Sequence, residues 1–309
     1  MVNWPIYTKD NEYKNSQIGN ENDKSWQEDF YFVQGADPQF GMMGTAYEKD
    51  GICRKADWSP ETINWDEEIR LAKLSVEKVN QLDPKPRFFI ICGDLTHQMP
   101  GEFPKLKQKQ IDDFKRVYSQ VDPSIALICV CGNHDVGDTP TPKSIQKYRT
   151  SYGDDYFSFW CGGVLFIALN TQYYKDRSCV QELAEEQDKW LDEQLDKANG
   201  SPIVCFSHIP WFVKDVDERE GIFNIPLEWR LKVLEKLYTA GVRYMFCGHY
   251  HRNAGTFYKN DFEIIINSAI GMQLGDDKSG MRLVKVSKDK ITHKYYDFES
   301  FPKDLNSKS

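Results

Sequence analysis

The chain has 309 residues, of which 40% are hydrophobic, so folding can bury a substantial core. Its formal net charge is −8, which repels polyanions at long range, and we therefore expect neither nucleic acid nor an anionic membrane as a partner. No stretch of the sequence approaches the roughly 18 apolar residues of a transmembrane helix, and we expect a soluble, cytoplasmic monomer.

The organisation of the chain indicates a single domain. A polar N-terminal arm at 1–29 lacks the apolar segment of a signal peptide and is expected to be loose. Residues 30–300 contain no linker, charge block or internal repeat, and a short polar tail follows at 301–309.

Cysteine usage points to a reduced protein. Four of the eight cysteines fall in apolar, strand-like runs: Cys92, Cys129, Cys205 and Cys247. Free cysteine in such runs packs as a small hydrophobic residue, so we expect no disulfide framework.

Strand and helix patterns alternate along the chain. Strands are predicted at 31–35, 88–92, 125–131, 156–160, 164–169, 203–207, 243–247, 262–267, 281–286 and 292–297. Helices are predicted from Asn64 to about residue 79, at 111–119, at 182–198, and from Pro226 to Gly241. The early β-α-β pattern favours parallel strands, and the closing strands favour an antiparallel part. The sequence therefore predicts an α/β (α+β) fold with two packed mixed sheets flanked by helices.

Polar side chains follow five of these strands at the point where each strand ends. They are Asp37, Asp94 after Gly93, the run Gly132-Asn133-His134-Asp135, His208, and the run Gly248-His249-Tyr250-His251. In open α/β sheets, sites form outside the carboxyl ends of strands, so these side chains should lie together. Oxygen and nitrogen donors without thiolate suit Mn, Fe, Zn or Mg, and there are enough donors for two divalent metal ions. The pattern predicts a dinuclear metal site.

The same motifs, in the same order, resemble the calcineurin-like metallophosphoesterase superfamily over about residues 30–298. The resemblance implies a four-layer α-β-β-α sandwich. It also implies seven metal ligands: Asp94 to both ions, Asp37, Gln39 and His251 to the first ion, and Asn133, His208 and His249 to the second. His134 would lie outside the metal ligands and donate a proton to the leaving oxygen or hydrogen-bond the phosphate, and Asp135 would orient His134.

Gln39 is the main departure from the family pattern, which commonly has Asp-x-His at this point. A neutral amide oxygen is a harder donor than imidazole, so we expect the first ion to be Mn or Mg rather than Zn. The alternative is that Gln39 is a loop residue away from the metal.

Residues that bind the substrate are less well defined by the sequence. No arginine follows Gly93-Asp94, so a phosphate-binding cation must come from elsewhere; Arg252 is a candidate and Arg282 a weaker one. His97 either lines the pocket or packs in its loop. The lysines of "PKLKQKQ" are expected in a solvated loop: Lys105, Lys107 and Lys109.

The functional prediction is a metal-dependent phosphomonoester hydrolase that uses a metal-activated hydroxide. The resemblance implies a serine/threonine protein phosphatase whose substrate is a phosphorylated protein such as a kinase. One alternative is a phosphodiesterase or nucleotide pyrophosphohydrolase with the same metal pair. A second is a weakly catalytic binding module of the same fold, which Gln39 favours and the presence of His134 and Asp135 argues against.

Overall fold

The computed structural model describes residues 4–45 and 59–306, and the strands within them form two sheets. The order across the eight-stranded sheet is β1 (Thr8–Lys9), β2 (Glu12–Tyr13), β6 (Phe157–Cys161), β7 (Val164–Ala168), β8 (Ile203–Phe206), β9 (Tyr244–Cys247), β11 (Phe262–Ile266) and β10 (Ala254–Tyr258). The order across the five-stranded sheet is β13 (Lys290–Asp297), β12 (Gly280–Ser287), β3 (Phe30–Gly35), β4 (Phe88–Cys92) and β5 (Ala126–Val130).

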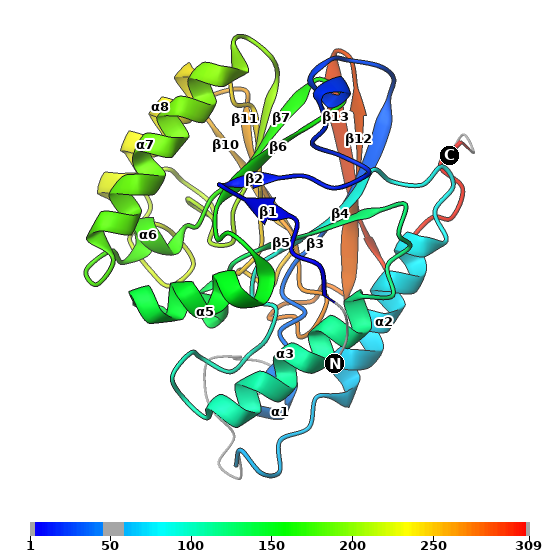
Figure 1. Cartoon of the computed structure of the whole chain (residues 1–309), viewed down its shortest axis with the longest axis vertical. Coiled ribbons are helices and arrows are strands. Elements are labelled where there is room, and N and C mark those ends of the chain that lie inside the picture. The colour runs from blue at the N-terminus through cyan, green and yellow to red at the C-terminus, as the bar shows by residue number, and fades with distance from the viewer. Residues whose placement is uncertain (1–3, 46–58, 307–309) are drawn as a thin grey trace.

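Helices cover the outer faces of the two sheets. The longer ones are α2 (Asp66–Asn80), α3 (Pro104–Tyr118), α5 (Pro142–Tyr152), α7 (Gln181–Ala198) and α8 (Leu227–Thr239). Single turns are α1 (Met42–Thr45), α4 (Asn133–Val136), α6 (Gln172–Lys175) and the 3-10 turn η1 (Glu21–Lys24). Figure 1 shows α7 and α8 on one side of the molecule, α2 and α3 on the other, and the strands between them. The two-sheet sandwich flanked by helices is the fold that the sequence predicts.

Strand directions also follow the prediction. β3, β4 and β5 run parallel, as do β7, β8, β9 and β11, while β12 pairs antiparallel with both β3 and β13. All ten predicted strands are present, with ends within two residues of those expected. Three short strands escaped prediction: β1, β2 and β10.

Aromatic side chains fill the space between the two sheets. Phe32 and Phe88 from the five-stranded sheet stack with ring centroids 4.6 Å apart and an interplanar angle of 11°. Phe32 also makes edge contacts with Phe166, Phe206 and Phe246 from the other sheet, at 5.5–5.8 Å. Such pairs contribute about 0.5–1.5 kcal/mol each beyond the burial of area. This packing fixes the two sheets relative to each other, and with them the ends of their strands.

Helix α3 begins earlier than predicted. Pro104 occupies its first turn, where the missing N–H costs nothing. The pattern of buried Leu106, Gln110 and Phe114 then continues the helix face toward its N-terminus. The prediction of a solvated loop at Lys105, Lys107 and Lys109 is therefore wrong: all three lie in the helix, Lys105 and Lys109 exposed but Lys107 buried.

The N-terminal segment is packed rather than loose over residues 4–29. β2 pairs with β6, and the side chains of Tyr13 and Ile18 are buried. Tyr13 also donates a hydrogen bond from its hydroxyl to the carbonyl of Leu127. Because the segment is polar overall, its few buried apolar residues were not recognised from the sequence.

The cysteines within the described residues are free thiols, and all but Cys179 are at least partly buried. Among the helices of residues 4–45 and 59–306, none has the length and apolar character needed to cross a membrane.

Candidate metal centre

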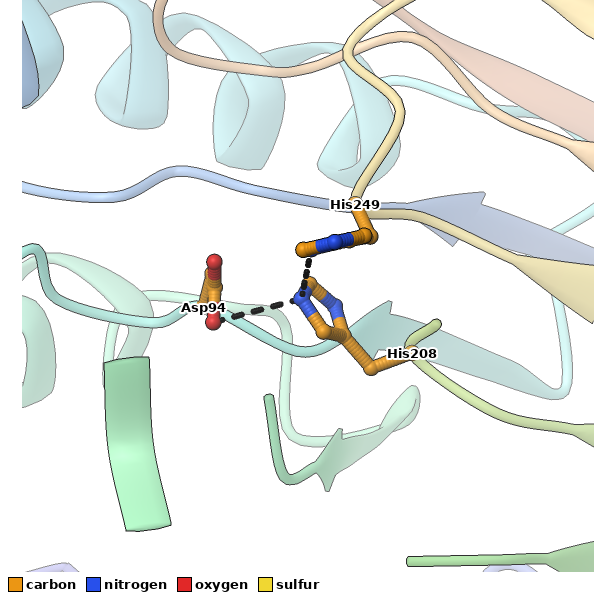
Figure 2. A group of neighbouring side chains, drawn as sticks. All are labelled: Asp94, His208 and His249. Atoms are coloured by element: carbon orange, nitrogen blue, oxygen red, sulfur yellow. Dashed lines mark hydrogen bonds and ion pairs between the residues drawn. The ribbon is translucent and has the colours of Figure 1, made fainter. Parts of the chain in front are cut away.

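The predicted site residues meet where strands of both sheets end. Asp37 and Gln39 follow β3, Asp94 follows β4, and Asn133 follows β5. His208 follows β8, and His249 and His251 follow β9. Figure 2 shows His208 between Asp94 and His249, with its ring directed toward both. The five strand ends that the sequence marked are thus brought together.

The backbone is strained at most of these residues. Within the described residues, ten non-glycine residues have a positive φ, and five of them are predicted ligands. These five are Asp37 (51°), Gln39 (37°), Asp94 (49°), His249 (65°) and His251 (53°). Such conformations cost about 1–3 kcal/mol each and cluster at functional sites. The surrounding fold therefore holds these side chains in directions that an unstrained loop would not give them.

Two glycines at strand ends allow their loops to approach the side chains of the site closely. A Cβ at Gly93, whose φ is +82°, would lie 2.2 Å from His208 Nδ1. A Cβ at Gly132 would lie 2.2 Å from Asp94 Oδ1. Only glycine lets the two loops come so near the site.

The carboxylate and imidazole groups form two sets that share one residue. Asp94, His208 and His249 make one set, and Asp37, Asp94 and His251 make the other. Within each set, the potential ligand atoms lie within 4.8 Å of one another. The shared Asp94 is the residue that the family resemblance gave as the bridge between two ions.

Backbone carbonyls fix the tautomers of the three histidines. One ring N–H is donated by each: His208 Nδ1 to Cys92 O at 2.8 Å, His249 Nε2 to Ile222 O at 2.8 Å, and His251 Nδ1 to Met272 O. When the ring is neutral, its other nitrogen carries the lone pair toward the centre of the site. This is the arrangement that a metal-binding imidazole requires.

The donor set fits a metal pair because acceptor atoms converge on one another. His208 Nε2 lies 3.3 Å from Asp94 Oδ1, 3.1 Å from Asn133 Oδ1 and 3.2 Å from His249 Nδ1. Around Asp37, the Oε1 atom of Gln39 is buried without a hydrogen-bond partner, and the buried Asp37 Oδ1 has only His251 Nε2 nearby, at 3.4 Å. Buried acceptors left unpaired cost about 1–3 kcal/mol each. Cations would satisfy all of them, and the orphaned Gln39 oxygen supports its assignment as a ligand.

Without metal, protons partly neutralise the site. Burial opposes the charge on His208, but the carboxylates of Asp94 and Asp37 overcome it and raise the pKa of His208 to about 9. Burial likewise opposes the charge on Asp94, but His208 and His134 hold the pKa of that carboxyl below its usual value. Burial and the neighbouring His208 lower the pKa of His249 to about 3. The site therefore attracts positive charge strongly enough to protonate one of its own ligands.

His134 stands beside the metal ligands at the edge of a cavity. Its backbone N–H donates to Asp94 Oδ1 at 2.8 Å, and its Nδ1 hydrogen-bonds the carbonyl of His97. The ring of His97 stacks on that of His134 with centroids 4.7 Å apart, and both residues line the cavity. His97 therefore lines the pocket, one of the two positions left open by the sequence.

The family resemblance implied that Asp135 orients the imidazole of His134. In the structure it does not. Its carboxylate instead accepts N–H bonds from Gly132 at 2.8 Å and from Leu95 at 3.2 Å. Asp135 is the third residue of the short helix α4, so its side chain turns back toward the start of that helix. Asp135 thus joins the two loops that carry Asp94 and His134, and the carbonyl of His97 orients the ring.

The cavity above these residues has a volume of about 610 Å³. Its apolar wall is formed by Met42, Met99, Ile209, Ile222, Phe223 and Leu274. Among the described residues that line it, Lys175 is the one lysine or arginine. The ammonium of Lys175 donates to the carbonyls of Gly221 and Asn224, at 2.5 and 2.7 Å.

The two arginines considered for phosphate binding lie elsewhere. Arg252 is not among the residues lining the cavity, and its guanidinium stands 4.8 Å from the centre of the Tyr250 ring. Arg282 is buried and donates to His293 Nδ1 at 2.9 Å and to Asn253 Oδ1. Both side chains are held by neighbouring side chains, which the sequence does not reveal.

Two residues near the site were missed by sequence reasoning. Asp138 accepts a hydrogen bond from Asn133 Nδ2 at 2.9 Å; its position five residues after a predicted ligand was the available signal. Lys107 donates from Nζ to the carbonyl of His134 at 2.9 Å. Its spacing of three and seven residues from Gln110 and Phe114 would have placed Lys107 on the buried face of a helix.

Comparison with known proteins agrees with this fold and site. The family model described as calcineurin-like phosphoesterase matches residues 63–253, and the chain belongs to that family. The chain is 45% identical over 285 residues to a Bos taurus protein named serine/threonine-protein phosphatase CPPED1, covering 91% of this chain and 88% of the relative. The Homo sapiens protein of the same name is 44% identical over 283 residues, covering 90% and 87%.

A solved structure supports the fold. The crystal structure of a dimetal phosphatase from Danio rerio superposes with a TM-score of 0.64, covering 88% of this chain and 97% of the other. At 13% sequence identity, this likeness concerns the arrangement of the sheets and helices.

Proposed function

We propose that this protein is a metal-dependent phosphomonoesterase that removes phosphate from serine and threonine residues of other proteins. The observation that carries the proposal is the pair of ligand sets sharing Asp94, with His134 beside them on the cavity edge. The relatives that match about nine-tenths of the chain are named as serine/threonine-protein phosphatases, which supports this substrate class.

The site would hold two divalent ions through the seven predicted ligands. When bound, two such ions would neutralise the phosphoryl oxygens and lower the pKa of a water toward about 7. The oxygen donors Asp37 and Gln39 favour Mn or Mg in the first position, because both metals prefer hard ligands.

His134 is suited to protonating the leaving oxygen. Its Nδ1 is occupied by the carbonyl of His97, which leaves Nε2 as the atom that can exchange a proton within the cavity. In the charged form, Nδ1–H keeps the ring oriented while the proton on Nε2 passes to the serine or threonine oxygen as its bond to phosphorus breaks. A positioned general acid contributes about 10²–10⁴ in rate.

The cavity walls support a protein substrate rather than a polyanion. The net charge of −8 and the single lysine among the described residues that line the cavity give little attraction to a second phosphate group. We propose a phosphorylated protein, such as a kinase, as the substrate of a monomeric, cytoplasmic enzyme that binds neither nucleic acid nor membrane.

The test is turnover after metal removal and reconstitution. Protein stripped with a chelator would be supplied with Mn, Mg, Fe or Zn and given a phosphoserine peptide, a cyclic nucleotide and a dinucleotide polyphosphate. We expect the peptide to be hydrolysed fastest, with Mn or Mg restoring activity. Faster turnover of either nucleotide would replace the proposal with a phosphodiesterase or pyrophosphohydrolase. Inactivity with all four metals, combined with tight phosphopeptide binding, would favour a binding module.

A further inference from the structure

Lys107 is a buried ammonium group with no part in the chemistry described above. It lies on α3, and only 3% of the residue is exposed. Its Nζ donates to Thr96 Oγ1 at 2.6 Å and to the carbonyl of His134 at 2.9 Å. These two acceptors belong to the loop after β4 and the turn after β5, so one side chain holds both loops against α3.

The same two loops position His134. The backbone N–H of His134 reaches Asp94 in the first loop, and its ring is held by the carbonyl of His97 in that loop. The carbonyl of His134, which accepts from Lys107, lies in the four-residue helix α4. Lys107 therefore holds the peptide group of the residue that faces the substrate cavity.

Charge gives a second reason for a lysine at this place. The carboxylate of Asp135 is buried, and it is not one of the predicted metal ligands. The carbonyl that Lys107 binds belongs to the peptide unit that joins His134 to Asp135. A buried charge is costly unless an opposite charge compensates it, and a lysine at this place brings a positive charge to the peptide unit next to Asp135.

We propose that Lys107 is a positioning residue for His134, which it holds at the distance from the leaving oxygen that proton donation requires. The inference rests on the proposed phosphatase function and adds to it the residue that aligns the proton donor. Removing the ammonium would free the His134 carbonyl and allow the short helix α4 to move. A displacement of about 1 Å at a reacting group can cost about 10²-fold in rate.

The experiment compares K107M, K107R and K109M on two phosphate monoesters. Lys109 is exposed on the same helix and serves as the matched control. One substrate is a phosphoserine peptide, whose alkoxide leaving group needs a proton. The other is 2,4-dinitrophenyl phosphate, whose leaving group does not. We expect K107M to lower kcat on the peptide by about 10- to 100-fold with little change in KM, and to lower kcat on the aryl ester less than about threefold.

K107R should restore most of the peptide activity because guanidinium also donates to the His134 carbonyl and keeps the charge. K109M should match the wild type on both substrates. Equal losses on the two substrates, or a loss in K107M without rescue by K107R, would overturn the positioning role and leave a general structural one. A wild-type protein inactive on both substrates would instead overturn the proposed function.

A second readout does not depend on turnover. Nitrogen NMR of the metal-free protein would report the environment of the His134 ring, which we expect to change in K107M and to return in K107R. Metal content measured by mass spectrometry should stay at the wild-type value in all three variants. An unchanged His134 signal in folded K107M would contradict the inference.

Discussion

Asn133 donates a hydrogen bond from Nδ2 to Asp138 Oδ1 at 2.9 Å, and this contact decides which end of the amide faces the metal site. With the nitrogen turned toward Asp138, Asn133 Oδ1 lies 3.1 Å from His208 Nε2 among the other acceptors. Asp138 would thus act on the predicted second metal position through Asn133.

Replacing Asp138 should therefore weaken that metal position without removing a ligand. We expect D138A to lower the affinity for one of two ions by about 10- to 100-fold, the usual loss when the partner of a ligand is removed. D138N keeps an oxygen acceptor for Asn133, so its metal affinity should fall much less. Titration calorimetry with Mn on chelator-treated protein measures both affinities. Identical binding in D138A and wild type would show that Asn133 needs no such support.

Substitutions of Gln39 test the first metal position. Its Oε1 is buried without a partner, while its Nε2 lies 3.3 Å from His97 Nδ1. We expect Q39A to bind one ion normally and the other at least about tenfold more weakly, because a ligand is lost. Q39H, with a softer imidazole donor, should shift the preference of this position toward Zn. Metal stoichiometry after dialysis measures both effects, and two tightly held ions in Q39A would place Gln39 outside the ligand set.

Metal binding should release protons at neutral pH. In the metal-free protein the pKa of His208 is about 9, above its ordinary value of 6.5, so most of this residue is charged at pH 7. An imidazole must be neutral to bind a metal, so binding at pH 7 should expel about one proton from His208, and His251, whose pKa is also raised, adds to the release. Calorimetry in two buffers of different ionisation enthalpy measures the number of protons released.

The same pKa shift has a consequence for the stability of the metal-free protein. The pKa of His208 is higher in the folded protein than in the unfolded chain. Its contribution to the free energy of unfolding is therefore complete below about pH 6.5 and is lost as pH rises through about 9. Metal affinity should rise over the same interval. Metal binding with no proton release at pH 7 would contradict the charged state of His208.

Gly93 is expected to be intolerant of any side chain. In G93A, the positive φ of +82° and a Cβ 2.2 Å from His208 Nδ1 add strain to a clash, and we expect a loss of about 2–4 kcal/mol in unfolding free energy. Gly200 offers a matched control, because its φ is +83° and a Cβ there would meet nothing within 4 Å. G200A should lose only about 1 kcal/mol. Urea unfolding of both metal-free variants checks the difference, and equal losses would show that backbone strain alone matters.

The strand pattern and the polar residues at strand ends were sufficient to predict the two sheets and the group of side chains that converges on Asp94. Apolar runs between turn residues are local signals, and parallel strands bring their carboxyl ends to one edge whatever the details of packing. The N-terminal strands and the start of α3 were missed because their few apolar residues lie among polar ones, where periodicity is weak.

The sequence by itself determined which residue types stand at the strand ends, and hence the family and the kind of site. Only the tertiary structure decided how those side chains are oriented and supported. Asp135 accepts backbone N–H groups instead of orienting His134, Arg252 stacks on Tyr250 away from the cavity, and Lys107 is buried behind His134. The physical reason is that these contacts join residues from separate elements, so they depend on the packing of α3, the short helix α4 and the two sheets rather than on any local pattern.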